Sequence, residues 1–303
     1  MPSLYAHYLF GQDALGQLDS EARAIAQAHA NLYALGLQGP DIFFYGSIIG
    51  PKSIELFGHN LHYRSLNGIL EEITTHLGAQ SGRIWGALPY PEVAYLMGFI
   101  GHFVLDSLCH PYIFKVQGNM VNHFALEADW DQYLLAQKTE TPWKIAMAPF
   151  VKTKKEDRLI LTDVYRAYQK EISPAKVQYS ARSIYRIHKH LAFPNRLKFR
   201  FLAWIMERLK INPDYLAMFI LPPEKGEKIH WNWPERPKDS IEILQGLYQD
   251  ALSLYPKLIS NFRDRLETGV HYMEFTNRNF EGHEKATHLH KTSTGVTKKE
   301  SET

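Results

Sequence analysis

The sequence predicts an all-α fold, and three observations support this prediction. Segments with the spacing of amphipathic helices follow one another along the chain and are separated by turns that contain glycine and proline. No segment shows the alternating apolar and polar residues of a half-buried strand. The 303 residues are 45% hydrophobic and 13% aromatic, which excludes a disordered chain and permits a large core.

The first predicted helix spans residues 14–36. Alanine is abundant in this segment, and Asp19 or Ser20 supplies a side-chain oxygen that can cap a helix. Gly36 is a residue type that commonly stands at a helix C-terminus. The Gly-Pro-Asp sequence at residues 39–41 then predicts a turn.

The middle of the chain is predicted to contain three helices. Residues 47–60 include glycine and proline and are predicted to form a loop, and residues 61–78 a helix that ends at a glycine. Two further helices are predicted over residues 90–110 and 119–137. The connection between them, residues 111–118, begins with a proline, and a helix often ends before a proline.

Beyond residue 141 the sequence predicts a series of additional helices. These are expected over residues 158–172, 175–191, 195–211 and 239–267. Residues 221–238 are rich in proline, tryptophan and charge and are predicted to be a loop. From residue 282 histidine, lysine, threonine and serine dominate, which predicts a disordered tail.

Metal-ligand residue types recur at helical spacing in the two central helices. The first helix carries His102, Asp106 and His110, each four residues apart, and the second carries His123 and Glu127. Residues four apart lie on one face of a helix, so each set forms a stripe. If the two helices pack antiparallel, these imidazole and carboxylate groups converge, and they are the ligand types of zinc and related metals.

The surroundings of these residues argue for a metal site over two structural alternatives. Residues 95–110 are otherwise almost wholly apolar, so the helix must be buried, and a buried unpaired carboxylate is costly. The alternatives are a buried His–Asp ion pair and a set of hydrogen-bonded core histidines. Either would suffice for one residue, but five such residues in one apolar hairpin favour a metal site.

Four residues near the N-terminus add weaker candidates. His7 alone suggests a surface residue, Asp41 alone suggests a turn stabilised by its own side chain, and His59 alone suggests a loop histidine. His62 lies three residues beyond His59. Together with the central helices, these residues complete an ordered series of histidines and carboxylates.

In this order of residues the chain resembles the bacterial zinc-dependent phospholipase C family, in which an all-helical domain holds a trinuclear zinc site. The resemblance covers residues 1–140, and it rests on His7, Asp41, His62 or His59, His102, Asp106, His110, His123 and Glu127. His62 is preferred over His59 because it opens the predicted helix. The resemblance implies a multi-helix domain of this type with additional C-terminal helices.

The resemblance also implies a division of the ligands among zinc ions. One ion would take Asp41, His62, His102 and Asp106; a second would take His110, His123 and Glu127; a third would take His7 and a bridging Asp106. In the secreted members the processed N-terminal amine and carbonyl complete the third site. This sequence begins at Met1, so two to three zinc ions are expected.

The expected function follows from this resemblance. We expect a metal-dependent hydrolase that cleaves a phosphodiester, in a phospholipid or another substrate, through a metal-bridged hydroxide. Asp41 is expected to bind metal and to accept a proton. A nuclease or nucleotidase using the same site is one alternative, and a non-catalytic scaffold stabilised by metal is another.

The resemblance divides the chain into three regions. Residues 1–140 would form the metal-binding catalytic core, residues 141–281 a helical continuation packed on it, and residues 282–303 the tail. The basic and aromatic helix at 195–211 is expected to pack on the core with its charges in water, and contact with a membrane surface is the alternative.

Composition sets the remaining expectations. The net charge of +2 does not favour a specific nucleic-acid partner, and the single cysteine, Cys109, excludes a disulfide within the chain. No targeting sequence is recognised near Met1, and no uncharged apolar run reaches 18 residues, so no transmembrane segment is expected. These features predict a cytoplasmic protein.

Overall fold

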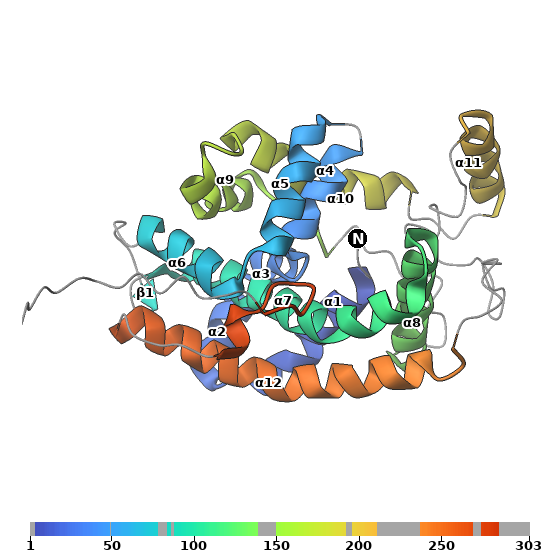
Figure 1. The fold of residues 1–303 in the computed structure, drawn as a ribbon. Helices are drawn as coiled ribbons and strands as arrows, with labels where there is room; N and C mark the ends of the chain where they lie inside the picture. Colours follow the sequence, from blue (N-terminus) through green and yellow to red (C-terminus); the bar gives the residue numbers. More distant parts are fainter. Residues whose placement is uncertain are drawn as a thin grey trace, which may run out of the picture.

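A computed structural model describes residues 4–48, 50–77, 84–85, 88–138, 150–191, 196–210, 237–268 and 274–284. The fold is all-α, as predicted (Figure 1). Its elements are α1 (Leu4–Leu15), α2 (Ser20–Ala28), α3 (Ala30–Gly36), the 3₁₀ turn η1 (Gly39–Asp41), α4 (Ile42–Ser47), α5 (Lys52–Tyr63), α6 (Leu66–Leu77), β1 (Ile84–Trp85), β2 (Leu88–Pro89), α7 (Tyr90–Gln117), α8 (Met120–Lys138), α9 (Lys155–Val164), η3 (Tyr165–Tyr168), α10 (Pro174–Leu191), α11 (Arg196–Arg208), α12 (Ser240–Thr268) and η5 (Glu274–Asn277).

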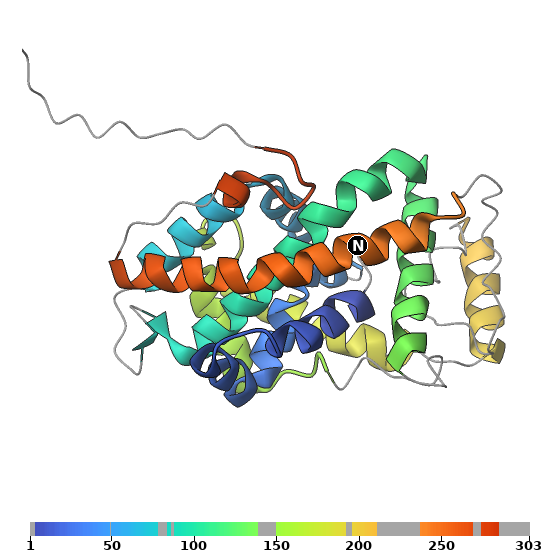
Figure 2. The same cartoon turned by 90° about the horizontal axis from the view of Figure 1, so that it is seen from below.

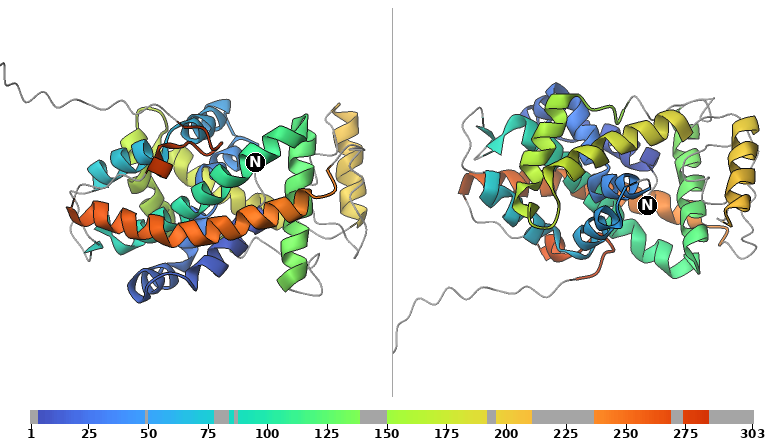
Figure 3. Two further views of the ribbon diagram at one scale, coloured as in Figure 1. Left: turned by 60° about the horizontal axis from the view of Figure 1, so that its bottom comes forward. Right: turned by 90° about the horizontal axis from the view of Figure 1, so that it is seen from above.

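Helix α7 forms the centre of the molecule. It packs against α1, α3, α8 and α12, and α12 runs across one face of the molecule while α10 lies toward the opposite face (Figure 3). Helix α7 is long and apolar enough to cross a membrane, but nearly all of its apolar stretch is buried inside the fold. Among the described residues the one sheet is a short antiparallel pair that joins Ile84 to Pro89 and Trp85 to Leu88.

The contact between α3 and α7 depends on two glycines. A Cβ atom on Gly36 would lie 2.1 Å from the Tyr95 carbonyl oxygen, and one on Gly98 would lie 2.2 Å from the Tyr33 carbonyl oxygen. Only glycine permits two helix backbones to approach this closely. Because His102 follows Gly98 by one helical turn, this crossing also determines where that histidine lies.

The prediction of one helix over residues 14–36 was wrong in its start and its continuity. Three helices, α1, α2 and α3, cover residues 4–36, and α1 ends just before Gly16. The Asp19 cap is confirmed, because its side chain accepts hydrogen bonds from the backbone N–H groups of Glu21 and Ala22. The last of the three helices ends at Gly36, as predicted.

The loop predicted over residues 47–60 was also wrong, because α5 occupies most of it. This helix buries four residues, Ile54, Phe57, Gly58 and Leu61, whose spacing of three and four residues makes one apolar face. That periodicity outweighs the helix-disfavouring effect of one glycine. The helix predicted over 61–78 is consequently split, since α5 ends at Tyr63 and α6 begins at Leu66.

The proline at the end of the central helix does not end it. Helix α7 continues through Pro111 to Gln117. Proline cannot donate to the carbonyl group of Ser107, and Gly282, from the C-terminal segment, packs closely against that carbonyl oxygen and the proline ring. The chain turns only at Gly118, which has a φ of 64°. Helix α8 then stands across the end of α7, rather than antiparallel to it as expected (Figures 1 and 2).

The C-terminal helices follow the predictions with small shifts. Helices α10 and α12 match the predicted segments 175–191 and 239–267, whereas the predicted helix 158–172 is replaced by α9 and η3. Most of the predicted loop 221–238 and most of the predicted tail lie outside the described residues. The first residues of that tail are ordered, because Glu284 forms a β-bridge with Arg278.

Candidate metal centre

The eight residues that the sequence singled out lie in one buried centre, with α7 and α8 contributing five of them and α1, η1 and α5 one each. They form three groups in which the ligand-type atoms of each group lie within 4.8 Å of one another: His7, His102 and Asp106; Asp41, His62 and His102; and His110, His123 and Glu127. His102 belongs to two groups, so two of the three groups are joined.

The first group is built around Asp41, at the end of η1. Nε2 of His62 lies 3.1 Å from Oδ1 of Asp41, and Nε2 of His102 lies 3.8 Å from Oδ2. Gly39 brings η1 against the His102 ring with a φ of 47°, and a Cβ atom there would lie 2.4 Å from that ring. A glycine is therefore required for Asp41 to reach this position.

The second group is built around Asp106. Nε2 of His7 lies 3.1 Å from Oδ1 of Asp106, and Nε2 of His102 lies 3.0 Å from Oδ2. The rings of His7 and His102 are stacked, with centroids 4.1 Å apart. Asp106 thus presents one oxygen to each of two histidines of the same group.

The third group lies where α8 crosses α7. Nε2 of His123 lies 3.0 Å from Oε1 of Glu127, and Nε2 of His110 lies 3.7 Å from the same oxygen. Nδ1 of His110 also lies 3.8 Å from Oδ2 of Asp106, which connects this group to the second. All four side chains are buried.

All five histidines direct Nε2 toward a carboxylate. Nδ1 of His7 has no hydrogen-bond partner among the described residues, and the other four rings use Nδ1 elsewhere. Their Nδ1 partners are the backbone carbonyl oxygens of Gly58 for His62 (2.8 Å), Leu37 for His102 (3.1 Å) and Phe280 for His110 (2.9 Å), and the Gln117 side-chain oxygen for His123. A carbonyl oxygen only accepts, so Nδ1 must carry the proton. In the neutral ring Nε2 then holds the lone pair that a metal needs, an arrangement typical of histidine ligands.

Several polar atoms that face this centre have no hydrogen-bond partner within the described part of the chain. They are both carboxylate oxygens of Asp41, Oδ2 of Asp106, Oε2 of Glu127 and Nε2 of His102. Burying carboxylate oxygens without compensation costs several kcal/mol per group, roughly. These buried oxygen and nitrogen atoms direct lone pairs toward one another, and this is an arrangement of ligand atoms that divalent cations can occupy.

The charges of the centre are strongly coupled. Burial opposes ionisation of both Asp106 and Glu127, but nearby histidines hold the pKa of Asp106 well below its usual range and that of Glu127 at about 2. Burial also disfavours a charged His110, yet Asp106, Glu127 and the Phe280 carbonyl raise its pKa to about 9. Burial lowers the pKa of His123, and Glu127 acts in the opposite direction.

The structure separates the two candidate histidines of α5. The His62 side chain is 11% exposed and reaches Asp41, whereas the His59 side chain is 49% exposed and lies 3.8 Å from Glu55, outside the centre. Both rings contact Phe44. His62 lies in the last turn of α5 and does not open a helix as expected.

Two further residues support the centre and were not predicted. Asp131, on α8, accepts hydrogen bonds from the backbone N–H groups of Ala6 (2.7 Å) and Tyr5 (3.3 Å) and so holds the first turn of α1, which carries His7. Its spacing of four residues from Glu127 was a usable signal. Phe280 contributes backbone atoms, since its carbonyl oxygen accepts from His110 and its N–H donates to the His62 carbonyl oxygen, and no sequence pattern marks such a role.

A family model described as zinc dependent phospholipase C matches residues 6–176, a range that includes all eight residues of the centre. No curated protein and no solved structure matches the chain.

Proposed function

Because the chain belongs to the zinc-dependent phospholipase C family, we propose that it is a zinc-dependent phosphoesterase that hydrolyses the phosphodiester bond of a phospholipid. The observation that carries this proposal is the common orientation of the histidines. Four rings direct Nε2 at three buried carboxylates while carbonyl oxygens fix the opposite nitrogen. A hydrogen-bonded polar core would not need every ring turned the same way.

The three groups suggest how the zinc ions are held. Asp41, His62, His102 and Asp106 would hold one ion, His110, His123 and Glu127 a second, and His7 with Asp106 a third. Three carboxylates and neutral imidazoles are the ligand chemistry that zinc prefers. The proposal is therefore two to three zinc ions for each chain.

The chain's own groups supply binding and proton transfer. Zinc, when bound, provides a Lewis acid and lowers the pKa of water toward neutrality. Among the described residues, neither buried carboxylate oxygen of Asp41 has a hydrogen-bond partner, which supports Asp41 as the group that takes the proton of the attacking water. The water oxygen then bonds to phosphorus, and the bond from phosphorus to the leaving oxygen breaks. The proton held by Asp41 passes to that oxygen, so that an alcohol leaves.

Metal content is the first test, measured by elemental mass spectrometry on protein without a histidine tag. Wild type is expected to hold two to three zinc ions, and Asp106→Ala and His62→Ala are expected to hold fewer. His59→Ala is the matched control, because it lies on the same helix but outside the centre. Equal zinc content in all four proteins, or none in wild type, would show that the centre is a polar core.

Activity is the second test. Zinc-loaded wild type is expected to hydrolyse phospholipid vesicles and a soluble aryl phosphodiester, and His62→Ala to reduce kcat by about 100-fold or more, while His59→Ala retains it. Hydrolysis of oligonucleotides but not of phospholipid would replace the proposed substrate by nucleic acid. A loaded wild type that cleaves no phosphoester would overturn the enzymatic function.

A further inference from the structure

Helix α11 exposes large apolar side chains to solvent. Phe201 is 59% exposed, Trp204 is 52% exposed and Leu209, just beyond the helix, is 64% exposed. The rings of Phe201 and Trp204 are stacked, with centroids 6.3 Å apart, and the guanidinium carbon of Arg208 lies 5.3 Å from the centre of the Trp204 ring. We refer to Phe201, Trp204, Arg208 and Leu209 as the α11 face.

The α11 face lies on the solvent-exposed side of the helix, and other residues form its partly buried side. Leu202, Ile205 and Met206 are partly buried, whereas Phe201 and Trp204, three residues apart, lie together on the exposed side. The expectation that the helix packs on the core with its charges in water did not include the exposure of these two aromatic residues. Exposed aromatic area of this kind is unfavourable in water, and in soluble proteins it commonly marks a binding surface.

The charge of this segment specifies the partner. Residues 196–210 contain five basic residues, Arg196, Lys198, Arg200, Arg208 and Lys210, and one acidic residue, Glu207. Arg200, Trp204 and Arg208 follow one another at four-residue spacing, which places them on one face of a helix. Aromatic rings bordered by arginine suit the boundary between acyl chains and anionic headgroups of a bilayer.

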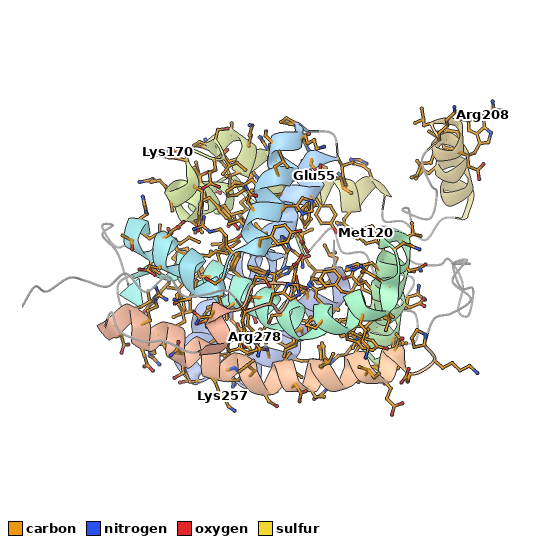
Figure 4. The ribbon with its side chains drawn as sticks, in the orientation of Figure 1. Glu55, Met120, Lys170, Arg208, Lys257 and Arg278 are labelled. Carbon is orange, nitrogen blue, oxygen red and sulfur yellow. The ribbon has the colours of Figure 1, made fainter. Side chains whose placement is uncertain are left out.

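The position of α11 makes it accessible to an extended surface. The helix stands at one end of the molecule, beyond α8, in every view (Figures 1, 2 and 3). Arg208 lies at the outer edge of the molecule and points away from the helical bundle (Figure 4). Among the described elements, α11 is therefore the one farthest from the central helix α7 at this end.

We propose that the α11 face docks the protein on the surface of a bilayer that contains anionic phospholipid. This proposal rests on the proposed function, because a phospholipid substrate lies in a bilayer. The aromatic rings would enter the headgroup region, and the basic residues would neutralise lipid phosphates. Docking would concentrate the enzyme at its substrate without any change in the metal centre.

The test is co-sedimentation of the full-length protein with vesicles of phosphatidylcholine alone or mixed with phosphatidylglycerol, with chelator present so that no lipid is cleaved. Wild type is expected to bind the mixed vesicles, and the double variant Phe201→Ala/Trp204→Ala to bind them at least about tenfold more weakly. Leu159→Ala is the matched control, because Leu159 is an exposed apolar residue on another helix, α9. Binding is also expected to fall as salt is raised.

Vesicle binding is compared with two measurements that report on the metal centre alone, zinc content and hydrolysis of a soluble phosphodiester. Loss of vesicle binding in the double variant, with zinc content, soluble activity and thermal unfolding unchanged, supports the proposal. The docking proposal is overturned if wild type does not bind the mixed vesicles, or if the double variant binds them with the same affinity as wild type. It is also overturned if the α11 face is required for binding a single-stranded oligonucleotide instead. Failure of soluble hydrolysis would count against the enzymatic function and not against docking.

Discussion

At the scale of single residues, Asp131 shows how a carboxylate on one helix positions a histidine on another. Its two oxygens accept the N–H groups of Tyr5 and Ala6, in the first turn of α1, where backbone donors have no partner within the helix. A negative charge there also interacts favourably with the helix dipole. His7 lies on the same turn and faces Asp106.

The variant Asp131→Asn keeps the size of the side chain but removes its charge. We expect it to lower the free energy of unfolding by about 1 kcal/mol. We also expect weaker binding of the zinc ion next to His7, while the ions at the other groups are retained. Urea unfolding and a zinc titration measure these effects, and Asp250→Asn, at an exposed position on α12, is the control. An unchanged zinc titration would show that His7 keeps its position without the charge of Asp131 at the N-terminus of α1.

His110 and Glu127 give the metal-free protein a defined pH dependence. The pKa of His110 is raised from 6.5 to about 9, so its contribution to stability is complete below pH 6.5 and is lost as the pH rises through 9. The pKa of Glu127 is lowered from 4.5 to about 2, so its contribution is complete above pH 4.5 and is lost as the pH falls through 2. The pair therefore stabilises the metal-free fold most between pH 4.5 and 6.5.

Zinc should remove the alkaline part of this dependence, because it replaces the proton on His110. Thermal unfolding of metal-free protein is expected to shift to lower temperature between pH 6.5 and 9, and the zinc-loaded protein is expected to change little over that range. Parallel curves for the two forms would show that zinc does not contact His110.

At the scale of elements, the crossing of α3 and α7 is set by glycine. A Cβ atom on Gly98 would lie 2.2 Å from the Tyr33 carbonyl oxygen, whereas one on Gly246, on α12, would meet no atom within 4 Å. Both are helical glycines, so the two positions differ in packing and not in helix propensity. This pair separates the steric role of glycine from its intrinsic effect on a helix.

The variant Gly98→Ala is expected to lower the free energy of unfolding by about 2 kcal/mol or more, because the two helices must separate. Gly246→Ala is expected to raise it by up to about 1 kcal/mol, because alanine favours the helix. Urea unfolding of both variants tests this difference. A similar effect of the two substitutions would mean that the crossing relaxes without cost.

At the scale of the whole molecule, the metal centre joins distant parts of the chain. The segment 274–284 places Phe280 against the His62 and His102 rings, with centroids 5.3 and 5.7 Å apart, and its carbonyl oxygen fixes His110. This segment lies beyond residues 6–176, which the family model matches. The C-terminal part of the chain therefore helps to orient His110, a candidate metal ligand in the region that the family model matches.

Truncation tests this role. A chain that ends after Met273 loses the Phe280 carbonyl, and its zinc affinity at His110 is expected to fall by about 10- to 100-fold, as it does when the partner of a ligand is removed. A chain that ends after Glu284 keeps the segment and serves as the control. Competition with a chromogenic chelator measures both. Equal affinity would show that the hydrogen bond to His110 is dispensable.

The periodicity of residue types along the sequence was sufficient to predict the all-α class and most of the candidate metal ligands. The stripe of His102, Asp106 and His110 and the pair on α8 were visible because residues four apart share a face of any helix. The all-α class followed from the same periodicity. Asp131 extends the α8 pair at the same spacing and was within reach of that reasoning.

Other features were decided only by the tertiary structure, because they depend on contacts between residues far apart in the sequence. Packing, not local preference, carried α7 through Pro111, turned α8 across it and left Trp204 exposed on α11. Backbone carbonyl groups fixed most of the histidine rings, and every residue has one, so no side-chain pattern could identify Phe280. The sequence determined which residue types could bind metal, and the fold determined which of their atoms face one another.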